Sequence, residues 1–341
     1  MVVTDASQKA PDGVAVLIPP RWLMNVLGRS GAKLFLMWRA GRQVHPYLYM
    51  GYHLFPGALS ALVVARLQGR PAANQMTGGP IELLGGGYSN ENTLMSSLRR
   101  SSRFLERLAL LVVREFDLVV VRGQHALEFL KARGISGNVA VITGSIPPTH
   151  GAVANRTIDV IFVGRLAPIK QPELFVQIVS RLIGSHPDLR AVVVGSGPEL
   201  SSLQREAQRL GVQDNLEFLG SQEDVGVFLR RSKVFVLTSR SEGMSIAMLE
   251  AMSHGVPPVV ADVGELSDVV HSGLNGWLVR GDDPQEYVAR IRSLLDDPVR
   301  WQRLSNAALE AASELAGVES VARRWRTSLA PFSGTPPGAV V

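Results

Sequence analysis

The second half of the chain alternates short apolar runs with longer amphipathic segments, and this alternation constrains the fold more than any other feature. The runs IDVIFVG, LRAVVVG, LEFLG, KVFVLTS and PPVVA are rich in β-branched residues, as strands are. The segments between them, such as ELSSLQREAQRL, have the periodicity of helices. Strands of a parallel sheet are buried on both faces, which explains why the runs contain few polar residues. The pattern therefore predicts an α/β domain in which helices cover both faces of a parallel sheet.

The first half of the chain is less regular, but it contains four candidate strands and two candidate helices. The strands are expected in VAVLIPP, YLYMGYH, FDLVVVRG and NVAVITG, and the helices in PGALSALVVARLQG and SRFLERLALLVVREF. The turn-rich segment PPTHGAVANRT separates the halves. We therefore expect an N-terminal domain of residues 1–155 and a C-terminal domain of residues 156–341. A last helix near residues 317–330 could pack back on the first domain.

Charge is distributed unevenly between the halves. Residues 1–157 contain 17 Lys and Arg against 8 Asp and Glu, whereas residues 158–341 contain 18 against 22. The basic half suggests an anionic partner, such as a membrane surface, a phosphorylated acceptor or nucleic acid, although a solvated surface explains it equally well. The absence of cysteine excludes disulfides, a thiolate zinc site and a cysteine nucleophile. Polar first residues and short apolar runs predict no secretory signal and no membrane span, and therefore a cytoplasmic protein.

The segment Arg21–Arg42 combines basic residues with Trp, Leu, Met and Phe and contains no acidic residue. Such a composition is typical of an amphipathic stretch at a membrane interface. A buried helix with a basic rim is the preferred interpretation, because Gly28 and Gly31 weaken a continuous helix.

The most informative segment is TSRSEGMSIAMLEAMSHGVPPVV, residues 238–260. It follows an apolar run, turns at Ser-Glu-Gly and enters a predicted helix that ends at Gly255. Glu242 lies in the loop before this helix and Glu250 lies inside it. Gly243 permits close approach of a ligand, and the free amides at the helix start, together with the helix dipole, suit a diphosphate.

Two further loops are expected at the same edge of the sheet, where ligands bind in such folds. GRLAPIKQPE offers Arg165 and Lys170, whose positive charges would stabilise a diphosphate leaving group. GSGPEL offers Gly195 and Gly197, although any tight turn from a strand to a helix uses glycine.

Over residues 158–295 these segments resemble the donor domain of the retaining glycosyltransferases of family 4. The resemblance rests on FVGRLAPIKQ, VVVGSGPE, LEFLGSQEDV, KVFVLTSRSEGMSIAMLEAM and GLNGWLV, in the order and spacing of that family. The separation of Glu242 and Glu250 after the Ser-Glu-Gly turn is its most specific element. The resemblance implies the GT-B fold, two facing Rossmann-like domains, with an N-terminal domain that is shortened in this chain.

The resemblance also implies a role for each matching residue. As catalytic groups, Arg165 and Lys170 would bind the diphosphate, and Glu242 would contact hydroxyls of the transferred sugar. Glu250 would accept hydrogen bonds from the ribose hydroxyls. Ser221 and Gln222 would lie beside the nucleobase, and Met244, Ser245 and Ile246 would supply backbone amides to the donor. The other residues expected at the donor are Gly164, Gly195, Gly197 and Gly243.

The acceptor side matches the family less closely. YHLFPGALSALVVARLQGRPAANQMTGGP resembles a segment in which a strand, a helix and a second strand lead to a pocket-lining histidine. His53 matches the end of the first strand, whereas Thr77 stands at the histidine position. Thr77, Gly78 and Gly79 could present a hydroxyl and amides to the transferred sugar, and His53 has an equally good structural explanation.

Together these features imply a glycosyltransferase that transfers a sugar from a nucleotide diphosphate-sugar to a hydroxyl acceptor with retention of configuration. Polysaccharide or glycolipid assembly is the expected context, with a saccharide or lipid-linked saccharide as acceptor and peripheral contact with the inner face of the plasma membrane. Cations and helix amides replace a divalent metal, and no Asp-x-Asp motif is present, so neither a metal nor a cofactor is expected.

Four other functions compete with this interpretation. A non-hydrolysing nucleotide-sugar epimerase would share the two-domain architecture, but it would not predict the Ser-Glu-Gly loop. A catalytically impaired scaffold that binds a nucleotide-sugar in a polysaccharide assembly complex would explain Thr77 and the shortened first domain. A dinucleotide-dependent oxidoreductase needs a third glycine where GSGPEL has Leu200. A nucleic-acid binder would use the basic half, but no recognised motif occurs there, so no nucleic-acid partner is expected.

Overall fold

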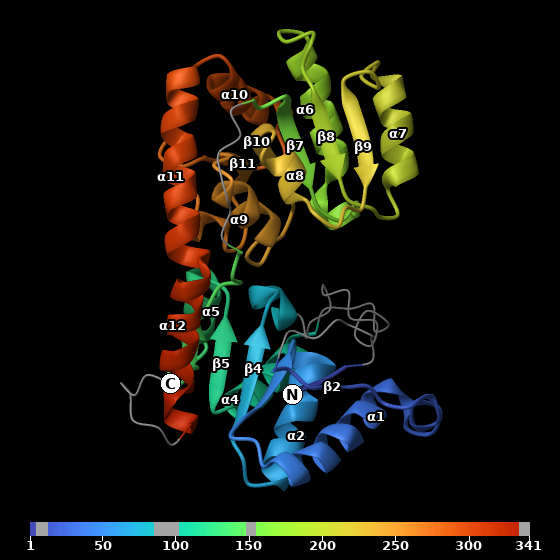
Figure 1. The fold of residues 1–341 in the computed structure, drawn as a ribbon, viewed down its shortest axis with the longest axis vertical. Helices are drawn as coiled ribbons and strands as arrows, with labels where there is room; N and C mark the ends of the chain where they lie inside the picture. The colour runs from blue at the N-terminus through green and yellow to red at the C-terminus, as the bar shows by residue number, and fades with distance from the viewer. Residues whose placement is uncertain (5–12, 85–101, 148–154, 334–341) are drawn as a thin grey trace. The chain divides into compact units, whose positions relative to one another are not determined.

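The structure is a computed structural model that describes residues 1–4, 13–84, 102–147 and 155–333. The chain forms two compact units (Figure 1). Unit 1 consists of Met1–Ile142 together with Arg324–Val341, and unit 2 consists of Thr143–Arg323. Within the described ranges, we find no helix with the length and apolar character that crossing a bilayer requires.

Unit 2 contains a six-stranded sheet in which all neighbouring strands are parallel, in the order β12-β11-β10-β7-β8-β9. The strands are β7 (Ile158–Val163), β8 (Ala191–Val194), β9 (Leu216–Gly220), β10 (Ser232–Leu237), β11 (Pro258–Ala261) and β12 (Trp277–Val279). The five strands predicted from the apolar runs are therefore confirmed. β7, β8, β10 and β11 are almost entirely buried, as strands covered on both faces must be.

Several helices of unit 2 pack with one another in pairs beside this sheet. The α-helices of this unit are α6 (Pro172–Ile183), α7 (Leu200–Arg209), α8 (Gly226–Leu229), α9 (Ile246–Ser253), α10 (Pro284–Leu295), α11 (Pro298–Ala316) and the first part of α12 (Val318–Leu329). α6 packs with α10, and α9 packs with α11. Asp283 and Asp297 cap α10 and α11 through their side chains, which explains why acidic pairs precede both helices.

The strand order of unit 2 reverses between β7 and β10. The chain proceeds from β7 to β8 and β9 on one side, and from β10 to β11 and β12 on the other. In open α/β sheets, ligands bind beyond the carboxyl ends of the strands at such a reversal. The loops after β7 and β10 therefore occupy the position where a ligand site is expected.

Unit 1 contains a four-stranded parallel sheet of order β3-β4-β5-β6. Its elements are β3 (Tyr49–Tyr52), β4 (Ala72–Met76), β5 (Leu118–Val121), β6 (Val139–Val141), α2 (Leu59–Leu67), α4 (Arg103–Arg114) and α5 (Gln124–Lys131), with short helices η1 (Leu54–Ala58) and η2 (Gly79–Glu82). The strand expected in VAVLIPP is only β2 (Val16–Leu17), which pairs with β1 (Val2–Val3) rather than with this sheet.

Helix α1 (Arg21–Val44) corrects the interpretation of the basic, aromatic segment. Gly28 has φ 69° and ψ 168°, which interrupts the helix, whereas Gly31 stays helical. Ala32 and Ala40 are buried after the interruption; before it Leu23 is buried, but Trp22 is 66% exposed. The preferred reading as a buried helix therefore holds for the part that follows Gly28, and before Gly28 it holds for Leu23 but not for Trp22.

The unit boundary falls between Ile142 and Thr143, earlier than the expected boundary at 155/156. The cause is a set of hydrogen bonds from the residues after β6 to the end of α11. The Thr143 hydroxyl donates to the carbonyl of Leu315 at 2.9 Å, and the Ile146 amide donates to that of Ala316 at 2.8 Å. Arg324 onward, including the end of α12, belongs to unit 1.

Candidate functional site

An ion pair joins the loops that follow β7 and β10. Lys170, in the short helix η4 (Pro168–Lys170), donates through Nζ to Glu242 Oε1 and Oε2 at 2.6 and 2.8 Å. The Glu242 side chain is 7% exposed and that of Lys170 is 24% exposed. The Ser239 hydroxyl also donates to Glu242 Oε1. Two residues that lie 72 positions apart in the sequence thus form one polar group at the carboxyl edge of the sheet.

Backbone contacts hold these two loops together. The Thr238 hydroxyl donates to the carbonyls of Lys170 and Gln171 at 3.0 and 2.8 Å, and the Arg240 amide donates to the carbonyl of Ile169 at 2.9 Å. Gly264 has φ +57°, and a Cβ there would lie 1.9 Å from the carbonyl oxygen of Glu242. The position of Glu242 is therefore determined by three segments of the chain.

The glycines of GSGPEL have a structural role that their sequence pattern did not reveal. A Cβ on Gly195 would lie 1.9 Å from the carbonyl oxygen of Gly164, and a Cβ on Gly197 would lie 2.2 Å from that of Leu166. The loops after β7 and β8 therefore touch through their backbones. The space that these glycines leave is filled by the neighbouring loop, which carries Arg165, an exposed residue.

Helix α9 begins at Ile246, with Ser245 as its N-cap. The Ser245 hydroxyl accepts a hydrogen bond from the Met248 amide at 3.3 Å, so this amide is already satisfied. Among the described residues, no backbone acceptor lies within hydrogen-bonding distance of the amides of Met244, Ser245 and Ile246. Met244 and Ser245 precede the helix rather than open it, but the three amides predicted to bind a diphosphate are available.

Glu250 lies on the same helix beside a pocket of about 330 Å³. Burial, and then the nearby Asp224, raise the pKa of Glu250. The pocket is also lined by Arg230 and His254, and burial, followed by Arg230, lowers the pKa of His254. A carboxylate destabilised by burial and by a second acid is suited to accept hydrogen bonds from hydroxyl groups.

Ser221 and Gln222 do not line this pocket. The Ser221 hydroxyl lies 2.8 Å from that of Ser196, and Gln222 donates to the carbonyl of Leu219 at 2.7 Å. Asp224 lines it instead, together with Arg230 and His254, none of which our sequence interpretation selected. Asp224 and Arg230 flank α8, and His254 caps the end of α9. These positions gave no signal, because solvated charges beside helix ends are common.

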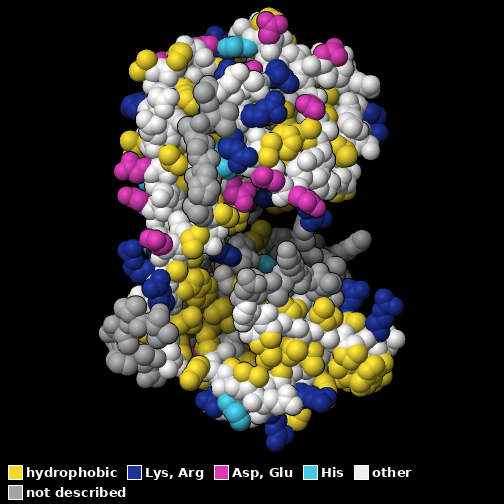
Figure 2. Space-filling model, viewed as in Figure 1, with side chains coloured by type: hydrophobic (Ala, Val, Ile, Leu, Met, Phe, Trp, Pro, Cys, Tyr) yellow, Lys and Arg dark blue, Asp and Glu magenta, His cyan; other side chains and the backbone are white. Residues whose placement is uncertain are grey.

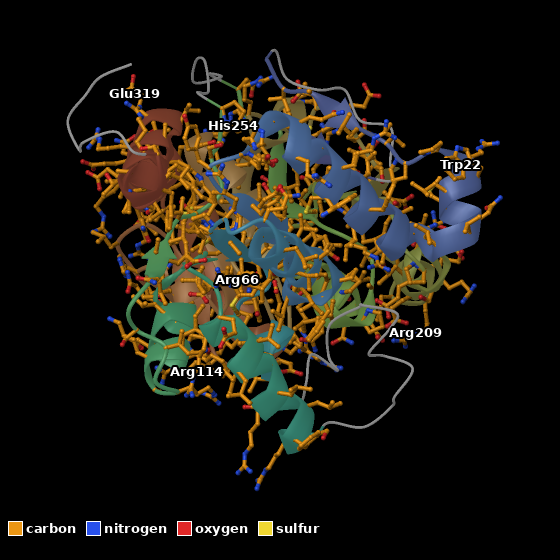
Figure 3. All side chains as sticks on the ribbon, turned by 90° about the horizontal axis from the view of Figure 1, so that it is seen from below. Trp22, Arg66, Arg114, Arg209, His254 and Glu319 are labelled. Carbon is orange, nitrogen blue, oxygen red and sulfur yellow. The ribbon has the colours of Figure 1, made fainter. Side chains whose placement is uncertain are left out.

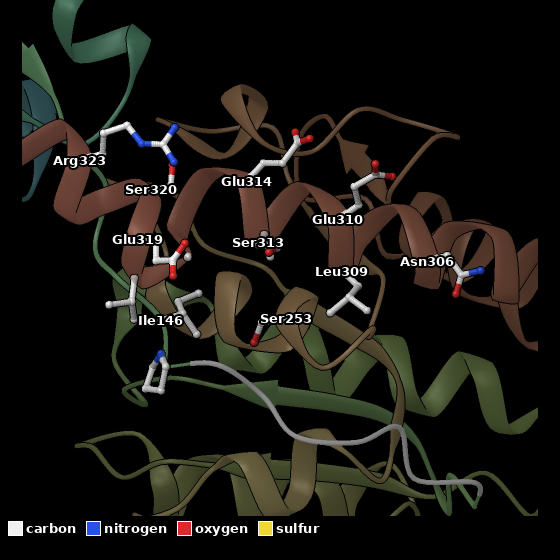
Figure 4. A pocket seen from close by; sticks show the side chains of 14 residues that line it. Ile146, Ser253, Asn306, Leu309, Glu310, Ser313, Glu314, Glu319, Ser320 and Arg323 are labelled. Carbon is white, nitrogen blue, oxygen red and sulfur yellow. The ribbon is translucent and has the colours of Figure 1, made fainter.

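A larger pocket of about 1160 Å³ lies along α11 and α12 (Figure 4). Glu310, Glu314, Glu319 and Arg323 project from the two helices around it, and Ser253 of α9 lies opposite. None of the residues predicted for the donor lines this pocket, and its three glutamates make it unsuitable for a diphosphate.

The residues predicted for the acceptor lie together in unit 1. The Thr77 hydroxyl is 3.2 Å from both ring nitrogens of His53. The Gly78 amide donates to Glu82 Oε1 at 2.6 Å, and Gly79 has φ +69° at the start of η2. Glu82 was not predicted, since a single glutamate in a turn-rich segment is usually solvated.

Comparison with known proteins gives a family match for most of unit 2. Residues 150–311 match the family described as "Glycosyl transferases group 1". This part of the chain, slightly less than half of it, is therefore similar to the glycosyl transferases of group 1. The matched residues include Lys170, Glu242, α9 and Glu250, which form the ion pair and the helix start described above.

Curated relatives match the same part of the chain. The D-inositol 3-phosphate glycosyltransferase of Streptomyces avermitilis is 34% identical over 163 residues, which cover 45% of this chain and 35% of the relative. The protein of the same description from Geodermatophilus obscurus is 37% identical over 154 residues, 42% of this chain and 34% of the relative. The match thus spans about a third of the length of these relatives.

Solved structures extend the likeness to both units. A mutant of S. aureus TarM in complex with Fondaparinux, alpha-GlcNAc-glycerol and UDP superimposes with a TM-score of 0.73 at 16% identity, covering 89% of this chain and 59% of that one. Anabaena Alr3699/HepE in complex with UDP gives 0.72 at 18% identity, with 93% and 86% covered. These likenesses confirm the GT-B fold, which consists of two Rossmann-like α/β domains.

Proposed function

We propose that this chain is a retaining glycosyltransferase that transfers a sugar from a nucleotide diphosphate-sugar to a hydroxyl acceptor. The Lys170–Glu242 pair beside the open amides before and at the start of α9 carries this proposal. A lysine and free amides suit a diphosphate, and an adjacent carboxylate suits sugar hydroxyls. The presence of UDP in the similar TarM and HepE structures supports the donor class.

In this mechanism the chain acts mainly by electrostatic stabilisation. Negative charge develops on the diphosphate as the glycosidic bond breaks, and Lys170, Arg165 and the amides near Ile246 stabilise it. Lys170 exchanges part of its contact with Glu242 for the phosphate oxygens, which frees Glu242 to accept from the sugar. The acceptor hydroxyl then attacks from the face that the diphosphate leaves, and its proton passes to the departing phosphate oxygen. Attack from this face retains the configuration. NMR of the anomeric proton in the product measures its configuration. A product with inverted configuration would contradict the retaining mechanism.

Binding of the donor nucleotide is the first test. At a ligand concentration 100 times the dissociation constant, the native state should gain about 2.7 kcal/mol, a clear rise in melting temperature. We expect one of UDP, GDP or ADP to produce this rise and Glu250→Ala to weaken its binding about tenfold, through loss of a charge-assisted hydrogen bond. Glu310→Ala, on the larger pocket, is the matched control and should change nothing. Equal binding by wild type and Glu250→Ala would contradict the assignment.

We further propose that turnover needs no divalent metal, because Lys170, Arg165 and helix amides supply the positive charge that a metal would supply elsewhere. Activity should remain within about twofold after EDTA treatment and dialysis, a change worth under 0.5 kcal/mol of barrier. Loss of activity that Mn²⁺ restores would contradict this.

Unit 1 presents features of a protein that binds peripherally to the cytoplasmic face of an anionic membrane, and we include this in the proposal. Trp22 and Val26 of α1 and Phe104 of α4 are exposed, and Phe104, Leu108 and Leu111 form a stripe of spacing i, i+4, i+7. Hydrophobic side chains cover much of the visible face of this unit (Figure 2). Figure 3 shows Trp22 at the outer end of α1 and Arg114 on α4. Arginines beside exposed apolar groups favour an anionic bilayer surface.

Vesicle co-sedimentation tests the membrane proposal. Replacing Trp22 and Phe104 together by serine should lower binding to anionic vesicles about tenfold, since each aromatic ring buries apolar area at the interface. Binding should also weaken as salt rises. Val299→Ser, at an 81% exposed valine of unit 2, is the control for a lost apolar surface residue. Equal losses in both variants, or binding to neutral vesicles alone, would contradict this part of the proposal.

The second candidate function is a scaffold that binds a nucleotide-sugar but transfers nothing. Thr77 at the expected histidine position is the observation that favours it. Donor binding without transfer to any saccharide or lipid-linked saccharide would support the scaffold. Polysaccharide or glycolipid assembly is the context that we propose for either function.

A further inference from the structure

A group of polar residues lies where three parallel strands of unit 1 end. His53, Thr77 and Arg122 are the residues that directly follow β3, β4 and β5. The three strands pair in parallel, and the register continues to their carboxyl ends. The three side chains therefore originate next to one another at the edge where ligands bind in such sheets.

Glu82, in the helix η2, forms a hydrogen bond with His53 of this group. Its side chain is 1% exposed, and its Oε1 accepts from His53 Nδ1 at 2.9 Å and from the Gly78 amide at 2.6 Å. The Thr77 hydroxyl lies 3.2 Å from both nitrogens of the same ring. His53 itself has φ +55°, a conformation that a non-glycine residue rarely adopts. Strained residues of this kind cluster at functional sites, where the surrounding contacts hold them in place.

The net charge of the group depends on the protonation of His53. The hydrogen bond from Glu82 raises the pKa of His53, against the opposing effects of burial and of Arg122. A protonated His53 neutralises Glu82, which leaves the charge of Arg122. The guanidinium of Arg122 is partly buried, and burial lowers its pKa against the opposing influence of Tyr52 and Glu82. Within the described ranges, it makes no hydrogen bond or ion pair of its own.

We propose that Arg122, Thr77 and His53 bind an anionic group of the acceptor, and that this group is a phosphate ester. The inference rests on the proposed function, since it assigns the acceptor class of the same reaction. A guanidinium binds two phosphate oxygens with its fork of N–H groups, and the Thr77 hydroxyl and His53 Nε2–H supply further donors. Three donor side chains from three strands match the several oxygens of a phosphate better than the two of a carboxylate. Glu82 is a positioning residue that orients the ring and raises its pKa.

Calorimetry on the full chain tests the proposal with glucose 6-phosphate, inorganic phosphate, glucuronate and glucose as probes. We expect glucose 6-phosphate to bind at least about tenfold more tightly than glucose and than glucuronate, because charge-assisted hydrogen bonds separate them. Arg122→Gln should weaken glucose 6-phosphate binding about tenfold or more, and Arg122→Lys should weaken it less. Arg107→Gln, the same change at an exposed residue of α4, should have no effect. Binding of glucuronate or glucose as tight as that of the phosphate, or an Arg122→Gln effect under twofold, would overturn the proposal.

The role of Glu82 has its own readout. Glu82→Gln keeps the size of the side chain but removes its charge, so the pKa of His53 measured by NMR should fall. Since a histidine binds an anion best when protonated, phosphate affinity in this variant should decline at a lower pH than in wild type. An unchanged His53 titration would overturn the positioning role. Measuring UDP binding on the same samples separates failure of this inference from failure of the proposed function. If UDP binds and glucose 6-phosphate does not, only this inference is overturned. If the protein binds none of the nucleotides, the proposed function is overturned.

Discussion

Lys170→Ala should lower the turnover of sugar transfer at least about 100-fold, equivalent to ~2.7 kcal/mol of barrier, since removal of one preorganised electrostatic partner has effects of this size. Lys170 Nζ lies 2.6 Å from Glu242 Oε1. This ion pair holds the charge of Lys170 at the carboxyl edge of the sheet, where we propose that the diphosphate binds. We expect the loss mainly in kcat, measured with saturating donor, because the leaving group gains most of its charge in the transition state.

The same substitution should destabilise unit 2, and this effect must be separated from catalysis. Glu242 is buried, and within the described part of the chain the Ser239 hydroxyl is the other side-chain donor to its carboxylate. Removal of the Lys170 cation should therefore cost about 2 kcal/mol, less than for a fully buried pair. Urea denaturation measures this cost and defines conditions under which the variant is folded. Activity is then compared under those conditions.

Lys233→Ala is the matched control for Lys170→Ala. Lys233 pairs with Asp159 at 2.7 Å, but this pair lies where β10 and β7 begin, at the opposite edge of the same sheet. Its side chain is 41% exposed, so its loss should change stability by less than about 1 kcal/mol and turnover by less than twofold. If Lys170→Ala stayed within about threefold of wild type, the diphosphate role of Lys170 would be wrong.

Gly195→Ala should destabilise unit 2 by about 4 kcal/mol, from backbone strain together with steric overlap. Gly195 has φ +139°, and its Cβ would lie 1.9 Å from the carbonyl oxygen of Gly164. That oxygen belongs to backbone and cannot rotate away as a side chain would, so the loops after β7 and β8 must separate. Urea denaturation measures the loss, and nucleotide affinity should fall with it because Arg165 follows Gly164 directly.

Gly211→Ala distinguishes the two causes. Gly211 has φ +69°, but nothing lies within 4 Å of its added Cβ. The free energy of unfolding of this variant should therefore fall by about 1 to 2 kcal/mol, the cost of placing a non-glycine residue in the left-handed conformation. Equal losses for Gly195→Ala and Gly211→Ala would show that backbone conformation, and not contact between the loops, accounts for the effect.

Much of unit 2 could be predicted because its local patterns are unambiguous. A strand buried on both faces must be apolar throughout, and IDVIFVG and KVFVLTS leave no other assignment. The Ser-Glu-Gly turn preceded a helix as predicted, although the helix begins at Ile246 because Ser245 takes the cap position.

Unit 1 was less predictable because its strands are short and partly polar. β4 has the sequence AANQM, and β2 contains two residues. Neither has the apolar alternation on which a prediction from sequence depends. Glu82 and Arg122 were overlooked for a different reason. Glu82 ends the short helix η2 and Arg122 follows β5, and a single charge in either place is usually solvated.

The sequence by itself determined the elements of unit 2, the glycine and serine turns at their ends, and the types of side chain that those turns carry. These follow from interactions between residues near in the chain, which periodicity and turn chemistry record. The tertiary structure alone decided which of these side chains meet. Lys170 contacts Glu242 because strand order places β7 beside β10, and His53 contacts Glu82 because β3 pairs with β4. Such pairings depend on register and on the packing of distant segments, and a linear pattern contains no record of either.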